Sequence, residues 1–226
     1  MQVTIITGAS RGIGRAITED LRSLDSDFLF LSSQVIDFEQ YNDVSNEVRF
    51  SLHSDRYDQI NLILCAAQIG TAKTIDLVEC EKLYRINLLG NLAVIKACES
   101  FGVKMRIVWF AGGGAAFPYP EFFGYSLSKV AVVRAVENLS LTLKNTSIIA
   151  LAPGAVETDM LKTVIASGAE IRTKTDISEP VNFVRKFITD EMDSESLSGC
   201  FLHVRDNMDL LKYDKRTSLF KLRRIE

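Results

Sequence analysis

The sequence predicts an α/β domain in which helices cover both faces of a mostly parallel sheet. Short runs of Val, Ile, Leu and Phe, as continuous as strands buried on both faces require, alternate with segments of helical periodicity. The chain has 226 residues, 47% of them hydrophobic and 24% charged, enough for one domain with a buried core. No internal repeat or linker divides the chain, so we expect a single domain over residues 1–226.

The predicted elements follow one another in regular alternation, which is typical of strands joined by helical crossovers. In chain order, the predicted strands are Val3–Thr7, Phe28–Leu31, Leu62–Ala66, Arg106–Phe110, Ser147–Leu151 and Cys200–Val204. The segments with helical periodicity are Gly12–Leu24, Tyr41–His53, Cys80–Phe101, Gly124–Lys144 and Glu179–Thr189.

One interval is too short for such a crossover. Only Ser32–Gln34 separates the apolar run FLFL from the run VIDF, whereas a crossover between parallel strands needs about a dozen residues. The two runs are therefore either one long strand or a strand followed by a short extended piece that leads to Asp37. We expect a βα unit to be missing after the second strand.

A glycine-rich segment, TIITGASRGIGRAI, joins the first strand to the first helix. Gly8, Gly12 and Gly14 permit a tight turn and a close approach of backbone to a pyrophosphate, and the N–H groups that begin the helix stabilise its charge. Glycines also serve ordinary turns, but this segment is the first βα turn of a predicted parallel sheet. That context predicts a dinucleotide site.

Tyr125 and Lys129 are four residues apart, a spacing that places both side chains on one helix face. A free tyrosine, with a pKa of about 10, is a poor acid or base near neutrality. A neighbouring ammonium favours the phenolate and lowers that pKa, which suits proton transfer during ketone reduction. The alternative is an ordinary exposed pair.

Together, Thr7–Gly14, Tyr125–Lys129 and the segment LAPGAVETDM resemble the short-chain dehydrogenase/reductase family of single-domain NAD(P)-dependent enzymes. The resemblance extends from Val3 to about Val204. It implies a Rossmann-type, doubly wound parallel sheet with the site at the carboxyl ends of the strands. It also implies an oxidoreductase that transfers hydride to a small carbonyl or quinonoid substrate, with Tyr125 as acid/base.

The resemblance assigns roles to further residues. Lys129 is expected to tune Tyr125 and hold the nicotinamide ribose, Asn87 to support the lysine through a water, and Asp37 to accept a hydrogen bond from the adenine. Cys65–Gln68 stands where the family has Asn-Asn-Ala-Gly. The expected cofactor-binding residues are Gly8, Ser10, Arg11, Gly12, Ile13, Gly14, Ser32, Asp37, Ala66, Ala67, Tyr125, Lys129, Pro153, Gly154, Val156 and Thr158.

The residues after the second strand favour NADP(H) over NAD(H). NAD recognition usually places a carboxylate at that strand end, and Ser32–Gln34 contains none. Arg11 resembles the basic residue that NADP-dependent family members carry in the glycine-rich turn, and a guanidinium suits a phosphate. The alternative for Arg11 is simple solvation at a helix start.

The family serine that hydrogen-bonds the substrate oxygen is missing. Its place, 13 or 14 residues before the tyrosine, is held by Gly112 and Ala111, and Ser126 and Ser128 lie on the wrong side of Tyr125. Such a loss typically costs about a hundred- to a thousandfold in rate.

Three explanations of the missing serine stay open. In the first, backbone N–H groups of residues 112–114 substitute for the hydroxyl. In the second, the substrate needs less help, as in the dihydropteridine reductase branch, which also has a shortened region after the second strand and an Ala/Gly stretch. Or the chain is a dinucleotide-binding sensor or scaffold without turnover.

Composition argues against several other classes. A formal net charge of −3 gives no reason to expect nucleic acid, no apolar run approaches the roughly 18 residues of a membrane span, and no signal-peptide pattern opens the chain. The four cysteines have no metal-ligand spacing, so we expect no metal and a cytoplasmic protein.

Family resemblance suggests a homodimer or homotetramer built on the predicted helices Cys80–Phe101 and Gly124–Lys144. Residues from about 205 to 226 form a partly basic C-terminal extension.

Overall fold

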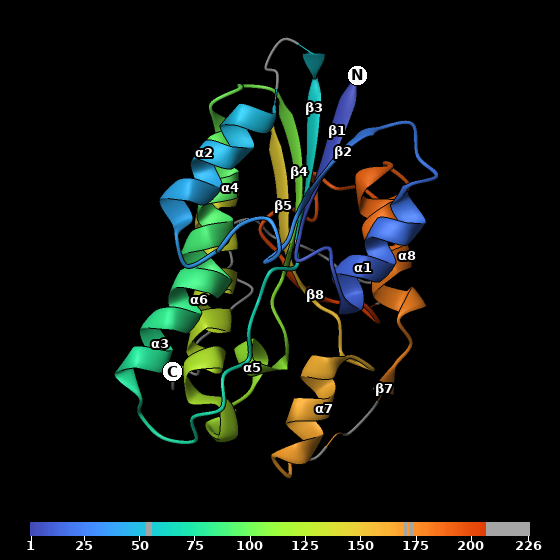
Figure 1. The fold of residues 1–226 in the computed structure, drawn as a ribbon. Coiled ribbons are helices and arrows are strands. Elements are labelled where there is room, and N and C mark those ends of the chain that lie inside the picture. The colour runs from blue at the N-terminus through green and yellow to red at the C-terminus, as the bar shows by residue number, and fades with distance from the viewer. Residues whose placement is uncertain (53–55, 170, 172–173, 207–226) are drawn as a thin grey trace, which may run out of the picture.

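A parallel sheet forms the centre of the structure, a computed structural model that describes residues 1–52, 56–169, 171 and 174–206 (Figure 1). Within these residues the sheet has six strands in the order β2-β1-β3-β4-β5-β8, and every neighbouring pair runs parallel. The strands are β1 (Gln2–Thr7), β2 (Asp27–Leu31), β3 (Gln59–Leu64), β4 (Lys104–Phe110), β5 (Thr146–Ala152) and β8 (Phe201–His203). The predicted doubly wound α/β fold is confirmed.

Helices cover both faces of this sheet (Figure 1). One face carries α1 (Gly12–Leu21) and α8 (Ser178–Ile188), and the other carries α2 (Tyr41–Ser51), α4 (Gly90–Glu99) and α6 (Phe123–Thr142). Smaller elements are α3 (Leu77–Tyr84), the π-helical turn η2 (Arg85–Leu89), α5 (Gly113–Ala116), the 3-10 turn η3 (Pro120–Phe122), α7 (Asp159–Ala166), β6 (Ala155–Val156) and β7 (Lys174–Thr175).

Alternating side chains of the strands build the two halves of the core, as expected for a sheet buried on both faces. Ile5 belongs to the buried cluster that includes Val94 of α4, whereas its neighbour Ile6 belongs to the cluster that includes Phe187 of α8. Both isoleucines are fully buried. Because helices cover both faces of the sheet, the loops that follow the strands lie at the carboxyl ends of the strands.

As predicted, a βα unit is missing after β2, and this changes the order of the strands at that edge of the sheet. Helix α2 leads from β2 directly to β3 on the far side of β1, and β2 stays at the edge. The expectation of one long strand or an extended piece at residues 35–38 is wrong. The backbone N–H groups of Val35 and Ile36 each donate to the carbonyl of Ser32 at 2.9 Å, so a turn follows β2.

The predicted helix Cys80–Phe101 is composite. It begins earlier, at Leu77, because the Asp76 carboxylate caps the N–H groups of Val78 and Glu79 at 3.0 Å each. It then passes through η2 into α4. Helix α7 was not predicted. In the described part of the chain, no helix has the length and apolar character needed to cross a bilayer. The C-terminal extension after residue 206 lies outside the described residues.

Candidate functional site

The glycine-rich turn is sterically fixed at the carboxyl end of β1. Gly8 has φ +68° and Gly12 has φ +55°, conformations that favour glycine. A Cβ on Gly8 would lie 2.9 Å from the backbone nitrogen of Ala66, and one on Gly14 would lie 2.3 Å from the carbonyl oxygen of Gly8. No larger residue fits either position without displacing backbone. The turn therefore packs directly against the end of β3, in the compact form that a dinucleotide phosphate requires.

A buried asparagine, Asn91, ties the first and third strands together beside this turn. The Thr7 hydroxyl donates to Asn91 Oδ1 at 2.9 Å and accepts from the N–H of Ala66 at 3.0 Å. Asn91 Nδ2 donates to the carbonyl of Ala66 at 3.0 Å. The bonds hold the backbone that is expected to line the cofactor ribose. Asn91 was not predicted from the sequence, although its position one helical turn after Asn87 was an available signal.

Asn87 lies in the π-helical turn η2 and is fully buried. Its Oδ1 accepts from the N–H of Gln68 at 2.8 Å, and its Nδ2 donates to the Gln68 carbonyl and to Ser128 Oγ, both at 2.9 Å. The Ser128 hydroxyl donates to the carbonyl of Tyr125 at 2.7 Å. Asn87 thus joins the loop after β3 to α6. Single-turn π segments are frequent at functional sites.

Tyr125 and Lys129 share one face of α6, as their spacing predicts, and both are buried. The Lys129 ammonium lies 5.6 Å from the centre of the Tyr125 ring and donates to the Phe110 carbonyl at 2.8 Å. Burial lowers the pKa of Lys129 to about 8 and raises the pKa of Tyr125 above its usual value. The chain alone therefore does not produce the expected lowering of the tyrosine pKa, because removal from water disfavours the phenolate.

Gly112 stands at the position of the family serine and has a backbone conformation that requires glycine. Gly112 has φ +143° and ψ 175°, a conformation essentially restricted to glycine, and α5 begins at the next residue. A Cβ on Gly112 would lie 3.0 Å from the Tyr125 hydroxyl oxygen. Ser126 and Ser128 donate instead to the carbonyls of Phe123 and Tyr125. The wall of the site beside the tyrosine hydroxyl is thus bare backbone.

The segment after β5 faces the glycine-rich turn. The Thr158 methyl carbon Cγ2 would lie 3.3 Å from a Cβ on Gly12. Gly154 has φ +73° and sits so close to Thr175 of β7 that a Cβ would lie 2.1 Å from the threonine hydroxyl. Residues 155 and 156 pair with residues 174 and 175, which fixes this loop. The structure thus brings two of the sequence motifs, at residues 8–14 and 153–158, together.

Four further predicted cofactor residues, Ser10, Arg11, Ser32 and Asp37, differ in their exposure to solvent. Ser10, Arg11 and Asp37 are exposed, whereas Ser32 is buried. Asp37 Oδ1 accepts from the N–H of Glu39 at 2.9 Å, which leaves its other oxygen for a ligand. The charge of Arg11 adds a small lowering to the pKa of Asp159 on α7, after the larger effect of Lys162, so Arg11 lies within electrostatic range of that helix.

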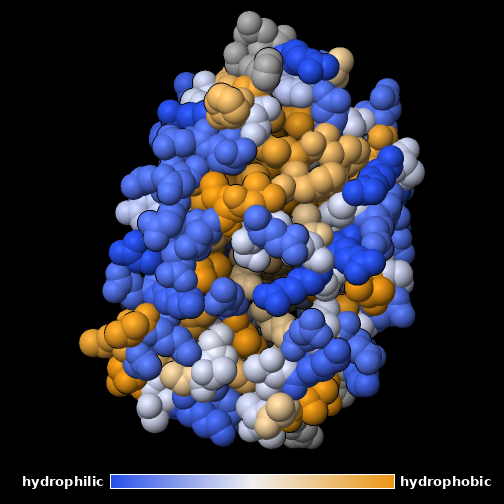
Figure 2. All heavy atoms as spheres, in the orientation of Figure 1, coloured by the Kyte–Doolittle hydropathy of each residue, from blue (hydrophilic) through white to orange (hydrophobic). Residues whose placement is uncertain are grey.

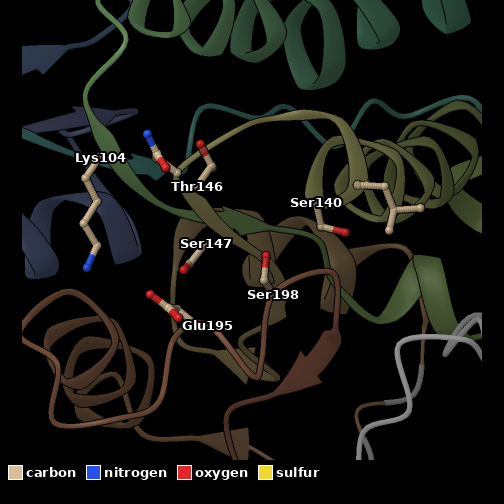
Figure 3. A pocket seen from close by; sticks show the side chains of 8 residues that line it. Lys104, Ser140, Thr146, Ser147, Glu195 and Ser198 are labelled. Atoms are coloured by element: carbon tan, nitrogen blue, oxygen red, sulfur yellow. The ribbon is translucent and has the colours of Figure 1, made fainter.

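A pocket of about 390 Å³ lies at the opposite end of the sheet (Figure 3). It is lined by Lys104, Ser140, Leu141, Asn145, Thr146, Ser147, Glu195 and Ser198, from the starts of β4 and β5, the end of α6 and the segment before β8. Ser198 Oγ accepts from the N–H of Ile148 at 3.1 Å, and the hydroxyl of Ser194 donates to that of Ser147. These bonds join β5 to the segment before β8. This pocket is separate from the candidate site.

In the part of the chain that the structure describes, no group of residues forms a potential metal centre. Among the described residues, no three His, Cys, Asp or Glu side chains are gathered for a metal ion. All four cysteines are free thiols, and two of them, Cys98 and Cys200, are buried. Burial raises the pKa of Cys200 to about 11, which keeps it a neutral thiol near pH 7.

The fold and the site define a Rossmann-type protein of the dehydrogenase class, with a glycine-rich turn after its first strand and a buried Tyr–Lys pair. The family described as short chain dehydrogenase matches residues 20–168. The chain belongs to this family, and its members are oxidoreductases.

Known relatives and solved structures agree with this assignment. The chain is 27% identical to a benzil reductase ((S)-benzoin forming) of Bacillus cereus, over 78% of this chain and 84% of the relative. It is 25% identical to the 3-oxoacyl-(acyl-carrier-protein) reductase FabG of Aquifex aeolicus, over 92% and 97%. Its fold matches 4-hydroxyisoleucine dehydrogenase complexed with NADH and succinate, with TM-score 0.70, 20% identity and coverage of 88% and 96%. It also matches ElxO with NADP bound, with TM-score 0.72, 16% identity and coverage of 90% and 96%.

Proposed function

We propose that this chain is an NADP(H)-dependent oxidoreductase that reduces a small carbonyl or quinonoid substrate, with Tyr125 as acid/base. The observation that carries the proposal is the buried Tyr125–Lys129 pair at the carboxyl end of β4. The lysine is held there by the Phe110 carbonyl, and the tyrosine hydroxyl faces the bare backbone of Gly112. A buried, paired phenol and ammonium beside a glycine-rich phosphate turn are suited to hydride chemistry coupled to proton transfer.

The residues around the glycine-rich turn and the Tyr125–Lys129 pair fit a nicotinamide dinucleotide. The turn at residues 8–14 would hold the phosphates, the Ala66–Ala67 backbone the adenosine ribose, and residues 153–158 the nicotinamide end. Gly8 and Gly14 keep this turn packed against the backbone of Cys65 and Ala66, because a Cβ on either glycine would collide with backbone atoms. When bound, the dinucleotide supplies the hydride. The NADP preference is supported by the absence of a carboxylate from Ser32–Gln34 and by the exposed guanidinium of Arg11.

The chain's own residues manage the proton. Tyr125 donates its hydroxyl proton to the substrate oxygen during reduction. Lys129, whose pKa is about 8, is mainly an ammonium at pH 7 and stabilises the phenolate that remains. Asn87 positions the pair through Ser128, because the Ser128 hydroxyl binds the backbone of the residue that carries the phenol. In this scheme, Asn87 acts through its neighbours and does not contact Lys129 directly.

The bare wall at Gly112 supports a substrate that needs little help with its oxygen. Without a serine hydroxyl, an unactivated ketone loses a donor worth about a hundred- to a thousandfold in rate. A 1,2-diketone or a quinonoid ring is already electron-poor and tolerates that loss better. The relative of Bacillus cereus, named for benzil reduction, makes a diketone the first compound to test.

We infer a homodimer or homotetramer built on the composite helix α3–η2–α4 and on α6, in a cytoplasmic protein. Membership of the family, whose members are often oligomers, supports the proposed assembly.

Oxidation of NADPH, followed by absorbance with benzil, quinonoid dihydropterin, quinones and keto-sugars, tests the proposed function. We expect turnover with at least one electron-poor acceptor. We expect Tyr125→Phe to bind NADPH normally and to lose at least about a hundredfold in turnover. Equal turnover by Tyr125→Phe would remove the tyrosine from the chemistry. NADPH binding without turnover of any acceptor would favour a sensor or scaffold.

A further inference from the structure

Strand β2 ends the sheet with an unpaired outer side in the described residues. Its sole strand neighbour among them is β1, because the βα unit that would follow β2 is missing. Edge strands of this kind present free N–H and C=O groups to other chains. The missing unit therefore leaves a site for strand pairing.

The hydrogen-bonding direction of each β2 residue follows from its bond to β1. The N–H of Gly8 donates to the Leu31 carbonyl at 2.7 Å, so the polar backbone groups of Leu31 point toward β1. Backbone groups alternate sides along a strand. Leu29 therefore also bonds toward β1, and the N–H and C=O groups of Phe28 and Phe30 point outward.

The outer side of β2 carries few of the features that normally protect an edge. The run Phe28–Leu31 contains no proline, lysine or other charge, and Phe28, Leu29 and Phe30 are only partly buried. The rings of Phe28 and Phe30 stack 5.7 Å apart, with the Arg22 guanidinium 5.6 Å from the Phe30 ring. Figure 2 shows hydrophobic surface between the hydrophilic faces of the two helical layers, on the face of the molecule seen in Figure 1.

We propose that β2 pairs with β2 of a second copy of this chain, antiparallel about a two-fold axis at Leu29. This register places Phe28 opposite Phe30 of the other copy, and Phe30 opposite Phe28. Both are residues whose backbone groups point outward, so each pair exchanges two hydrogen bonds. The pattern is self-complementary, as an interface between identical subunits requires.

The side chains agree with this register. On one face the two stacked phenylalanine pairs of the two copies meet as cross-strand aromatic pairs, which stabilise antiparallel strands. Asp27 lies opposite a leucine, so no charge of the strand faces a like charge. The interface is distinct from any dimer built on α4 or α6, because those helices lie on the face of the sheet and β2 is its edge.

Cysteine cross-linking in the full chain tests both the interface and its register. Residues at the axis form a non-hydrogen-bonded pair with Cα atoms about 4.5 Å apart, within the range of a disulfide. We expect oxidised Leu29→Cys to form a covalent dimer in high yield. Phe28→Cys and Phe30→Cys should not cross-link alone but should cross-link when mixed. Wild-type protein, with its four native cysteines, sets the baseline.

The mass in solution gives a second measurement that requires no oxidation. Phe28→Pro removes an outward N–H without removing a bond to β1, and Phe28→Leu is the matched control that keeps the N–H. We expect light scattering to show the mass halved in Phe28→Pro only. Cross-linking of Leu29→Cys no stronger than the baseline, or equal cross-linking by Phe28→Cys alone, would overturn the proposal. An unchanged mass of Phe28→Pro, together with no covalent dimer of Leu29→Cys, would also overturn the proposal. It would mean that β2 is exposed to solvent or contacts something other than β2 of a second copy.

Discussion

Replacing Gly112 with serine, which restores the residue type that the family carries, should damage this protein instead of improving it. The backbone at Gly112 has φ +143°, so any side chain there costs about 1–3 kcal/mol of strain. For a chain of this size, that corresponds to a fall in Tm of roughly 2–12 °C. The new Cβ would also lie 3.0 Å from the Tyr125 hydroxyl oxygen and would displace the phenol.

Gly113→Ser is the matched control, because a Cβ on Gly113 meets nothing within 4 Å. We expect its free energy of unfolding to stay within about 0.5 kcal/mol of the wild type. Thermal melts and NADPH oxidation with the best acceptor should be measured on both variants. A Gly112→Ser protein that is as stable as the wild type and turns over a hundredfold faster would refute the reasoning. That result would mean that the site lacks only its hydroxyl.

Three other substitutions test the site. Arg11→Ala should raise the KM for NADPH more than that for NADH, and equal effects in steady-state kinetics would refute the NADP assignment. The pKa of Lys129 falls from 10.5 to about 8 on folding, so between these values the unfolded chain binds more protons. Wild-type stability relative to Lys129→Met should therefore rise with pH from 8 to 10, by at most about 1.4 kcal/mol per pH unit in urea melts; a flat difference would contradict this. Asn91→Ala leaves the Thr7 hydroxyl and the Ala66 carbonyl without their hydrogen-bond partner and should lower the free energy of unfolding by about 2–4 kcal/mol. A loss below about 1 kcal/mol would contradict the role of Asn91 in joining the first and third strands.

Local pattern was sufficient for the elements whose burial is periodic. The start and end of α6 lie within two residues of the prediction, and the missing crossover after β2 followed from chain length alone. The turn at Ser32 was not predictable, because VIDF has the apolar composition of a strand and only the bonds to the Ser32 carbonyl exclude it. Amino-acid composition alone does not distinguish a strand from a turn at these residues.

The candidate site was predictable where a residue's role depends on its neighbours in the chain. Tyr125 and Lys129 lie close together, as predicted, because a spacing of four residues matches one turn of a helix. Asn91 was missed because its partners Thr7 and Ala66 lie far away in sequence. The pKa of Tyr125 was expected to fall because the sequence shows the charge of Lys129 but not the burial of both groups.

A crystal structure of the full chain grown with NADPH tests the central claim most directly. We expect density for the dinucleotide along Gly8–Gly14, with the nicotinamide between Gly154 and the Tyr125 hydroxyl. No density for the dinucleotide along Gly8–Gly14 under saturating NADPH, or a phenol turned away from the nicotinamide, would contradict the proposed function.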